Sequence, residues 1–129
     1  MQRFLHLMRK LSIIDIADND INEVSGGQLQ RACICRSMMN NPKILFADEP
    51  TGALNRTSSM EVLEEMVKLN EEGTTIMMVT HDAKVAARCK RVLYIVDGNI
   101  KGEYLAPQEE MSQTDRERKL NTWLMDLGW

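Results

Sequence analysis

Apolar residues recur at a helical spacing in the first part of this 129-residue chain. At the N-terminal end they fall on one face of a helix, at Phe4, Leu5, Met8 and Leu11. After a polar, turn-rich stretch, the segment from Ser25 to about Asn40 has the composition of a second helix, and Pro42 follows it. The pattern therefore predicts an amphipathic helix at the N-terminus and a second helix that begins at Ser25.

Beyond Pro42 the apolar residues form three short continuous runs, at 43–47, 75–79 and 92–96. Such runs are typical of parallel strands that are buried on both faces. Between the first two runs lies a helical pattern, which we expect to begin at a Ser58-x-x-Glu61 capping box and to stop at Gly73. This order predicts an α/β fold, mainly a parallel sheet flanked by helices, with ligands at the carboxyl ends of the strands.

The last third of the chain has two further signals. Asp97-Gly98 separates two strand-like segments and predicts an antiparallel hairpin. After Pro107 the sequence is polar until apolar residues recur at helical spacing, at Leu120, Trp123, Leu124 and Leu127. We expect a short amphipathic helix there.

Composition narrows the classes of function. The net charge is −3, so no basic surface favours a nucleic acid, and we expect none as a partner. The three cysteines form no CxxC pair, which argues against zinc and suits a reducing cytosol better than a disulfide framework. No apolar run approaches the length of a membrane span, so we expect a soluble, untargeted chain.

Two acidic residues, Asp48 and Glu49, directly follow the first strand-like run. One carboxylate there could hold Mg²⁺ beside a phosphorylated substrate, and the other could orient or deprotonate a water molecule. Pro50 disfavours a helical conformation for Glu49, so we expect extended backbone there. The alternative is a solvated turn, which is the commoner meaning of such a pair.

The predicted second helix begins with two glycines, Gly26 and Gly27, inside a Ser25-x-x-Gln28 capping box. The alternative is an ordinary helix start. However, glycine in a helix costs up to about 1 kcal/mol relative to alanine, which suggests that a group approaches the backbone closely. Phosphate is the natural candidate, because helix N-termini attract anions and the Ser25 hydroxyl can donate to a phosphate oxygen.

Three segments in this order, VSGGQLQR, ILFADEPTGALN and MMVTHD, closely resemble the ATP-binding subunits of ABC transporters. The resemblance implies a P-loop NTPase fold and the cofactors ATP and Mg²⁺. It implies that a signature motif reaches the γ-phosphate of a nucleotide held mainly by the opposing subunit. The signature residues are Ser25, Gly26, Gly27 and Gln28.

The same resemblance implies roles for three further side chains and one loop. Asp48 would help to hold Mg²⁺, Glu49 would be the general base, and His81 would be the switch histidine that contacts the γ-phosphate. A lone histidine at a strand end is usually structural, so the functional role expected for His81 depends on the presence of the other motifs. The D-loop, which passes between the two nucleotide sites of the dimer, matches Gly52, Ala53, Leu54 and Asn55. Asn55 stands where the family usually has aspartate.

By resemblance the chain has three regions: a remnant of the helical subdomain (1–24), the signature helix with the α/β core (25–106) and a C-terminal tail (107–129). The implied partners are a second ATP-binding subunit, identical or different, and a separate transmembrane permease. The implied location is the cytoplasmic face of the membrane, where ATP hydrolysis would power transport. The ADEPTGALN segment looks most like the macrolide, lipoprotein-release and antimicrobial-peptide exporters.

No GxxxxGK[ST] phosphate-binding loop (Walker A) occurs in the 129 residues. Because phosphoryl transfer depends mostly on positioning, we expect negligible ATP hydrolysis by this chain alone. We also expect the missing Walker A strand to leave unpaired strand edges, so that the chain associates or rearranges. Two alternatives remain: a non-catalytic module that presents the signature to a partner, and a DNA-repair or chromosome-maintenance ATPase. The second is opposed by the lack of heptads and of a basic cluster.

Overall fold

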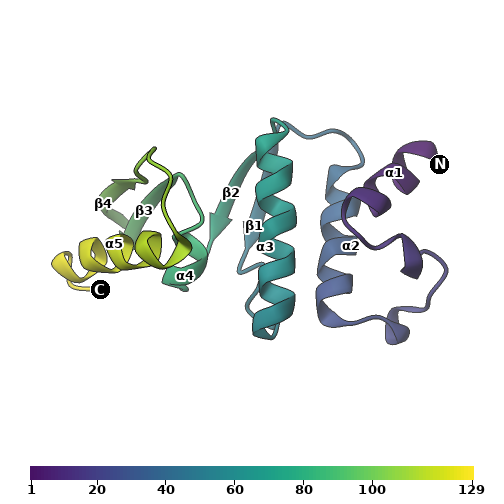
Figure 1. The fold of residues 1–129 in the computed structure, drawn as a ribbon, viewed down its shortest axis with the longest axis horizontal. Coiled ribbons are helices and arrows are strands. Elements are labelled where there is room, and N and C mark those ends of the chain that lie inside the picture. The colour runs from purple at the N-terminus through teal and green to yellow at the C-terminus, as the bar shows by residue number, and fades with distance from the viewer. The chain divides into compact units, whose positions relative to one another are not determined.

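The computed structural model describes residues 1–129, which divide into two compact units, Met1–Val79 and Thr80–Trp129 (Figure 1). The elements of the first unit are helix α1 (Gln2–Lys10), the short 3-10 helices η1 (Ile14–Ile16) and η2 (Ile21–Glu23), helix α2 (Gly26–Met38), strand β1 (Ile44–Asp48), helix α3 (Arg56–Glu71) and strand β2 (Thr75–Val79). The elements of the second unit are helix α4 (Ala83–Ala86), strand β3 (Arg91–Val96), strand β4 (Asn99–Leu105) and helix α5 (Gln113–Asp126).

In the first unit, β1 and β2 pair in parallel, with Ile44 opposite Thr75 and Asp48 opposite Val79. Helix α3 connects them, so the predicted strand, helix, strand order is confirmed. Helices α2 and α3 lie side by side and both begin at the lower end of the view in Figure 1. The core between these elements consists of Leu7, Met8, Leu11, Ile13, Ile34, Cys35, Met38, Leu45, Val62, Met66 and Leu69.

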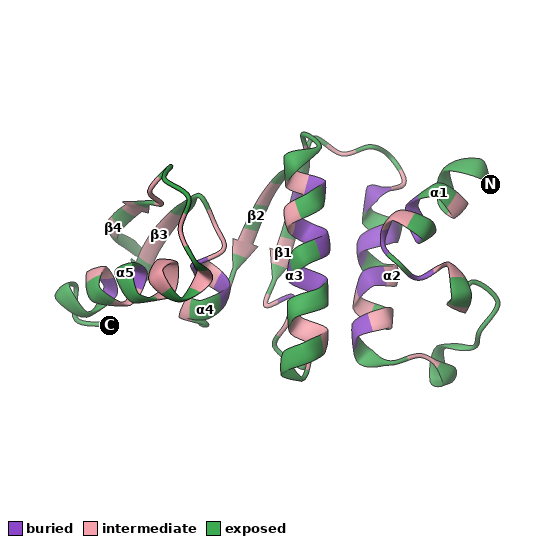
Figure 2. Ribbon diagram, in the orientation of Figure 1, coloured by how far each residue is buried: buried purple, intermediate pink, exposed green.

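The expectation that the strands are buried on both faces is wrong in this structure. Burial alternates along β1 and β2 (Figure 2), and four apolar side chains on one face are largely exposed, namely Ile44, Phe46, Met77 and Val79. The opposite face of β1 packs into the core, where Leu45 is only 6% exposed. A continuous apolar run is typical of a strand in a sheet that is covered on both faces. Within this unit, however, the helices cover only one face of the sheet.

The start of α3 also differs from the prediction. Its N-cap is Asn55, whose Oδ1 accepts a hydrogen bond from the Ser58 N–H at 2.8 Å. The Ser58 capping box is therefore wrong, because Asn55 supplies the cap three residues earlier. The predicted stop is confirmed: the helix ends at Glu71, and Gly73 adopts a left-handed conformation with φ +107°.

In the second unit, β3 and β4 form the predicted antiparallel hairpin. Asp97 and Gly98 both have positive φ, 49° and 74°, as a two-residue turn of type I′ requires. The predicted terminal helix is confirmed as α5, which buries Leu120 and Leu124. The aromatic ring of Trp123 packs on that of Tyr104, with centroids 5.4 Å apart. The structure contains two two-stranded sheets, one in each unit.

In each unit an arginine donates hydrogen bonds to carbonyls at the end of a helix distant in sequence. In the first unit Arg3 donates from Nε to the Met39 carbonyl at 2.6 Å and from Nη2 to the Met38 carbonyl at 2.8 Å. In the second unit Arg116 donates to the carbonyls of Ala87 and Cys89, at 3.0 and 3.3 Å. The Met38, Met39 and Ala87 carbonyls lie at helix C-termini, where the last groups lack helical partners, and the Cys89 carbonyl lies in the turn after α4.

The three cysteines are free thiols. Burial raises the pKa of the Cys35 thiol and of the Cys89 thiol, and at Cys89 the nearby Arg116 charge partly opposes that rise. Among the helices of the structure, none has both the length and the apolar character needed to cross a membrane.

Candidate functional site

The first turn of α2 has the geometry of an anion-binding helix start. The Gln28 N–H donates to Ser25 Oγ at 3.2 Å, and the Ser25 N–H donates to Gln28 Oε1 at 2.9 Å, so the predicted capping box is confirmed. The N–H groups of Gly26 and Gly27, at the first two helical positions, have no acceptor within the helix. Because Ser25 and Gly26 are exposed, a phosphate oxygen can approach this turn and its positive dipole end.

The two glycines also have close neighbours inside the chain. A Cβ placed on Gly27 would lie 3.0 Å from Ser58 Cβ, and one placed on Gly26 would lie 3.2 Å from Leu54 Cδ2. The sequence suggested phosphate as the group that approaches these glycines. At Gly27, the structure shows that the first turn of α3 already does so.

The acidic pair lies at the carboxyl end of β1. Asp48 is the last residue of the strand and is exposed, whereas Glu49 is half-buried. The Glu49 N–H donates to the Val79 carbonyl at 2.8 Å and continues the parallel ladder by one bond. The carboxyl ends of both strands therefore meet beside this pair, as expected for a parallel sheet.

The backbone of Glu49 is not extended, so that expectation is wrong. Its φ is +44°, in the left-handed region that ordinary residues avoid at a cost of about 1–2 kcal/mol. The physical reason is the turn that follows, because the Gly52 N–H donates back to the Glu49 carbonyl at 3.1 Å. This bond, with the bond to Val79, dictates the conformation more strongly than the preference imposed by Pro50.

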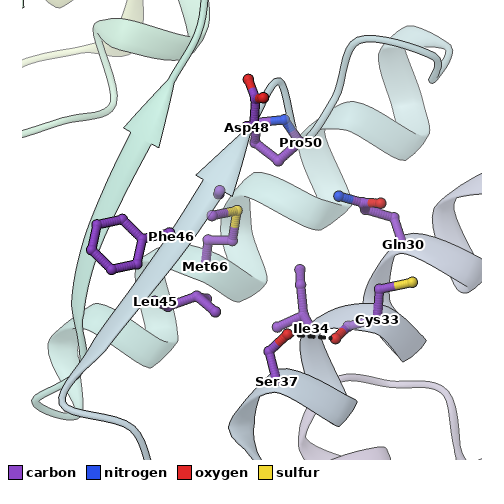
Figure 3. A pocket seen from close by; sticks show the side chains of 10 residues that line it. Gln30, Cys33, Ile34, Ser37, Leu45, Phe46, Asp48, Pro50 and Met66 are labelled. Carbon is purple, nitrogen blue, oxygen red and sulfur yellow. Dashed lines mark hydrogen bonds between the residues drawn. The ribbon is translucent and has the colours of Figure 1, made fainter.

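A cavity of about 150 Å³ opens between β1 and α2 beside Asp48 (Figure 3). Figure 3 shows Asp48 at the end of the strand, Gln30 on the neighbouring helix, and the Leu45 and Phe46 side chains on opposite sides of β1. Ligand pockets for small molecules usually have about 300–1,000 Å³, so this cavity is too small to enclose a nucleotide. This cavity therefore cannot by itself enclose a nucleotide.

The donor set around Asp48 fits a weakly held hard cation. The chain has no group of three or more His, Cys, Asp or Glu side chains arranged to hold a metal ion. Mg²⁺, however, usually takes only one or two protein carboxylates and completes its shell with water and phosphate oxygens. An exposed carboxylate at a strand end is compatible with that role.

His81 belongs to the second unit and is exposed in the turn before α4. Two hydrogen bonds fix this turn: the Asp82 N–H donates to Thr80 Oγ1 at 3.0 Å, and the Lys84 N–H donates to Asp82 Oδ1 at 2.8 Å. Asp82 is thereby the N-cap of α4. The turn presents His81 at the surface of its own unit.

The structure brings together the SGGQ turn (residues 25–28) and the loop 52–55, which sequence reasoning had treated separately. Leu54 lies against Gly26, and Asn55 caps the helix that supports Gly27. The sequence did not reveal that Ser58 lies against Gly27, or that Arg31 donates to the Gly27 carbonyl. Arg31 is only 9% exposed, and the available signal was a positive charge four residues after Gly27, within the core-facing helix.

Solved structures with the same fold are ATP-binding cassettes. A bacterial ABC transporter cassette solved as a dimer matches with a TM-score of 0.69 and 39% identity, covering 81% of this chain and 46% of its own. A cassette of another ABC transporter matches with a TM-score of 0.80 and 18% identity over 99% of this chain, which supports the fold alone. The fold is therefore part of the α/β P-loop NTPase fold of an ATP-binding cassette.

Sequence comparisons agree. The family model for ABC transporters matches residues 1–52. The macrolide export ATP-binding/permease protein MacB of Campylobacter jejuni serotype O:2 is 50% identical over 94 residues, and that of serotype O:23/36 is 43% identical over 127 residues. The matches cover 73% and 95% of this chain but only 15% and 20% of those relatives. The chain belongs to the ABC transporter family, as part of its ATP-binding component.

Proposed function

We propose that this chain contributes to an ATP-binding subunit that powers export through a membrane permease, by presenting its SGGQ turn to a nucleotide held by a second cassette. The observation that carries the proposal is the first turn of α2. Ser25 and Gly26 are exposed there, while the cavity beside Asp48 is too small for a nucleotide. An exposed turn that can bind phosphate, but that does not lie in a pocket of its own, is what we expect where a partner subunit holds the rest of the nucleotide.

In this proposal each named residue has one task. The amides of Gly26 and Gly27 and the Ser25 hydroxyl, held in place by Gln28, donate to the γ-phosphate. Asp48 is the carboxylate that would hold Mg²⁺, an ion that supplies neutralising charge for phosphate oxygens. Glu49 is the candidate base for the attacking water, and His81 is the candidate contact to the γ-phosphate.

The loop Gly52–Asn55 is the proposed D-loop. Asn55 replaces the usual aspartate and retains its helix-capping bond to the Ser58 N–H. The change removes a charge but not the cap, so its effect is expected on communication between nucleotide sites rather than on folding.

The partners follow from the relatives. A solved relative was captured as a dimer with ADP and Pi, and the curated relatives are named as combined ATP-binding and permease proteins. We propose a second cassette and a permease as partners, ATP and Mg²⁺ as ligands, and a location on the cytoplasmic face of a membrane. The names of the relatives favour the macrolide-export group among exporters.

The test is complementation in trans. A full-length cassette of similar sequence, with its own signature serine disabled, is mixed with this chain, and ATP hydrolysis is measured. Wild-type chain is expected to restore hydrolysis, and Ser25→Arg is expected to abolish the restoration because the arginine blocks the turn. Ser37→Arg, at an exposed serine further along α2, is the matched control.

Two outcomes would overturn parts of the proposal. If the wild-type chain restores nothing, the SGGQ turn does not act across a dimer. If the chain alone hydrolyses Mg-ATP at a rate that Glu49→Gln removes, it holds a complete site, and the expectation of negligible activity is wrong. Restored hydrolysis without activity of the chain alone supports presentation in trans over independent catalysis.

A further inference from the structure

A side chain at Gly27 would be crowded against α3. A Cβ at this position would meet Ser58 Cβ at 3.0 Å and Ser58 Oγ at 3.2 Å, distances that real Cβ atoms rarely show. The neighbouring Gly26 has only the flexible end of Leu54 within reach, at 3.2 Å. The two glycines of the turn are therefore not equivalent: the second rests directly on α3.

Ser58 cannot easily move away to make room. It occupies the first turn of α3, and its N–H is bound to the Asn55 side chain at 2.8 Å. A shift of Ser58 would break that cap, which stabilises the start of α3. The position of Ser58 is thus set by the loop 52–55 that leads into the helix.

Gly27 is also held through its carbonyl. Arg31 donates from Nε to the Gly27 carbonyl and from Nη1 to the Leu11 carbonyl, each at 3.4 Å, and its Nη2 lies 3.5 Å from Glu61 Oε2. Glu61 lies on α3, three residues after Ser58. Two separate contacts therefore attach the SGGQ turn to the first two turns of α3.

From this geometry we propose that Ser58 is a positioning residue for the SGGQ turn. Its side chain supports the Gly27 backbone, so that the turn and the loop 52–55 form one rigid block. The contact between Ser58 and Gly27 implies that a movement of the loop is transmitted to the SGGQ turn. That this movement also reaches groups facing a nucleotide rests on the proposed function. Ser58 itself contacts no nucleotide in this proposal.

The test is a double-substitution cycle at the contact. Gly27→Ala introduces the clash and is expected to lower the ATP hydrolysis restored in trans by about tenfold, because overpacking a rigid contact displaces the turn. Ser58→Gly in the same chain removes the opposing Cβ and leaves Ser58 Cα at 3.6 Å, an ordinary contact. The double variant is expected to recover to within about threefold of Ser58→Gly alone.

Two controls isolate the contact. Ser58→Ala keeps the Cβ, so it should not rescue Gly27→Ala. Thr57→Gly introduces the same flexible residue at an exposed position one residue earlier and should not rescue it either. Rescue by Ser58→Gly alone is a result that a general loss of stability would not give.

Hydrogen exchange of the Gln28 and Leu29 amides, which donate to Ser25 Oγ and to the Ser25 carbonyl, is measured on the chain alone and gives a second readout. Exchange should become about tenfold faster in Gly27→Ala and return toward the rate of Ser58→Gly in the double variant. If exchange does not respond to Gly27→Ala, or responds without rescue, the proposal is wrong. If exchange recovers but restored hydrolysis does not, the nucleotide rather than Ser58 requires Gly27, and the positioning role is also wrong.

Failure of the proposed function is distinguishable from failure of this inference. If wild-type chain restores no hydrolysis, the proposed presentation in trans fails. The exchange cycle then decides alone whether Ser58 fixes the turn.

Discussion

The two units differ strongly in the amount of apolar surface that they bury. The first unit encloses a core to which α1, α2, β1 and α3 all contribute, and the second has only four buried apolar side chains, Val85, Ala87, Leu120 and Leu124. The second unit compensates with half-buried aromatic residues, such as Tyr104 and Trp123, packed around α5. The SGGQ turn and the acidic pair therefore lie on a well-packed unit, whereas His81 lies on a unit whose small core leaves little margin of stability.

The largest expected effect is on that small core. Leu120→Ala should destabilise the second unit by about 3 kcal/mol, because a fully buried leucine leaves a cavity that few neighbours can fill. Limited proteolysis with mapped cleavage sites should show new cuts within residues 80–129, and the exposed Lys119→Ala on the same helix should show none. Cuts spread equally over both units would mean that the units do not differ in this way.

Arg3 and Arg116 give a smaller effect that compares the units directly. Arg116→Met and Arg3→Met each remove hydrogen bonds to two carbonyls, at a cost of about 1–2 kcal/mol. The same loss of free energy should lower the urea midpoint of the second unit more, because a unit that buries less surface has a weaker dependence of stability on urea. Arg118→Met, which removes only an exposed ion pair, is the control and should change little. An equal response to Arg116→Met and Arg3→Met would argue against a difference in margin.

The smallest expected effect concerns the cap of α3. Asn55→Ala should destabilise the first unit by about 1 kcal/mol, and Asn55→Asp should be nearly neutral, since aspartate caps as well as asparagine. Thermal melting followed by circular dichroism measures both. A loss of stability in Asn55→Asp as large as in Asn55→Ala would show that the amide group has a role beyond capping.

Much of the fold could be predicted because its signals are local. The capping box at Ser25, the Asp97-Gly98 turn and the stop at Gly73 each depend on a few neighbouring residues. Even the missed start of α3 was a local error, since Asn55 and Ser58 are both good capping residues and the sequence does not rank them.

The features that could not be predicted depend on residues distant in sequence. Glu49 adopts its left-handed conformation in a turn closed by Gly52, while its N–H bonds to Val79, on another strand. Whether the face of β1 that includes Phe46 is exposed depends on which other elements cover it. The spacing of apolar residues along the strand does not contain that information. For the candidate site, the residue types and their order were visible, but the support of Gly27 by Ser58 was not.

The left-handed backbone at Glu49 also has an evolutionary consequence. Glycine and asparagine adopt this conformation most readily, so selection for folding alone would favour either of them over glutamate at position 49. Neither has a carboxylate. The glutamate found there marks a position where selection for a stable chain and selection for a chemically useful side chain oppose each other, and a library sorted separately for each property should diverge at this residue first.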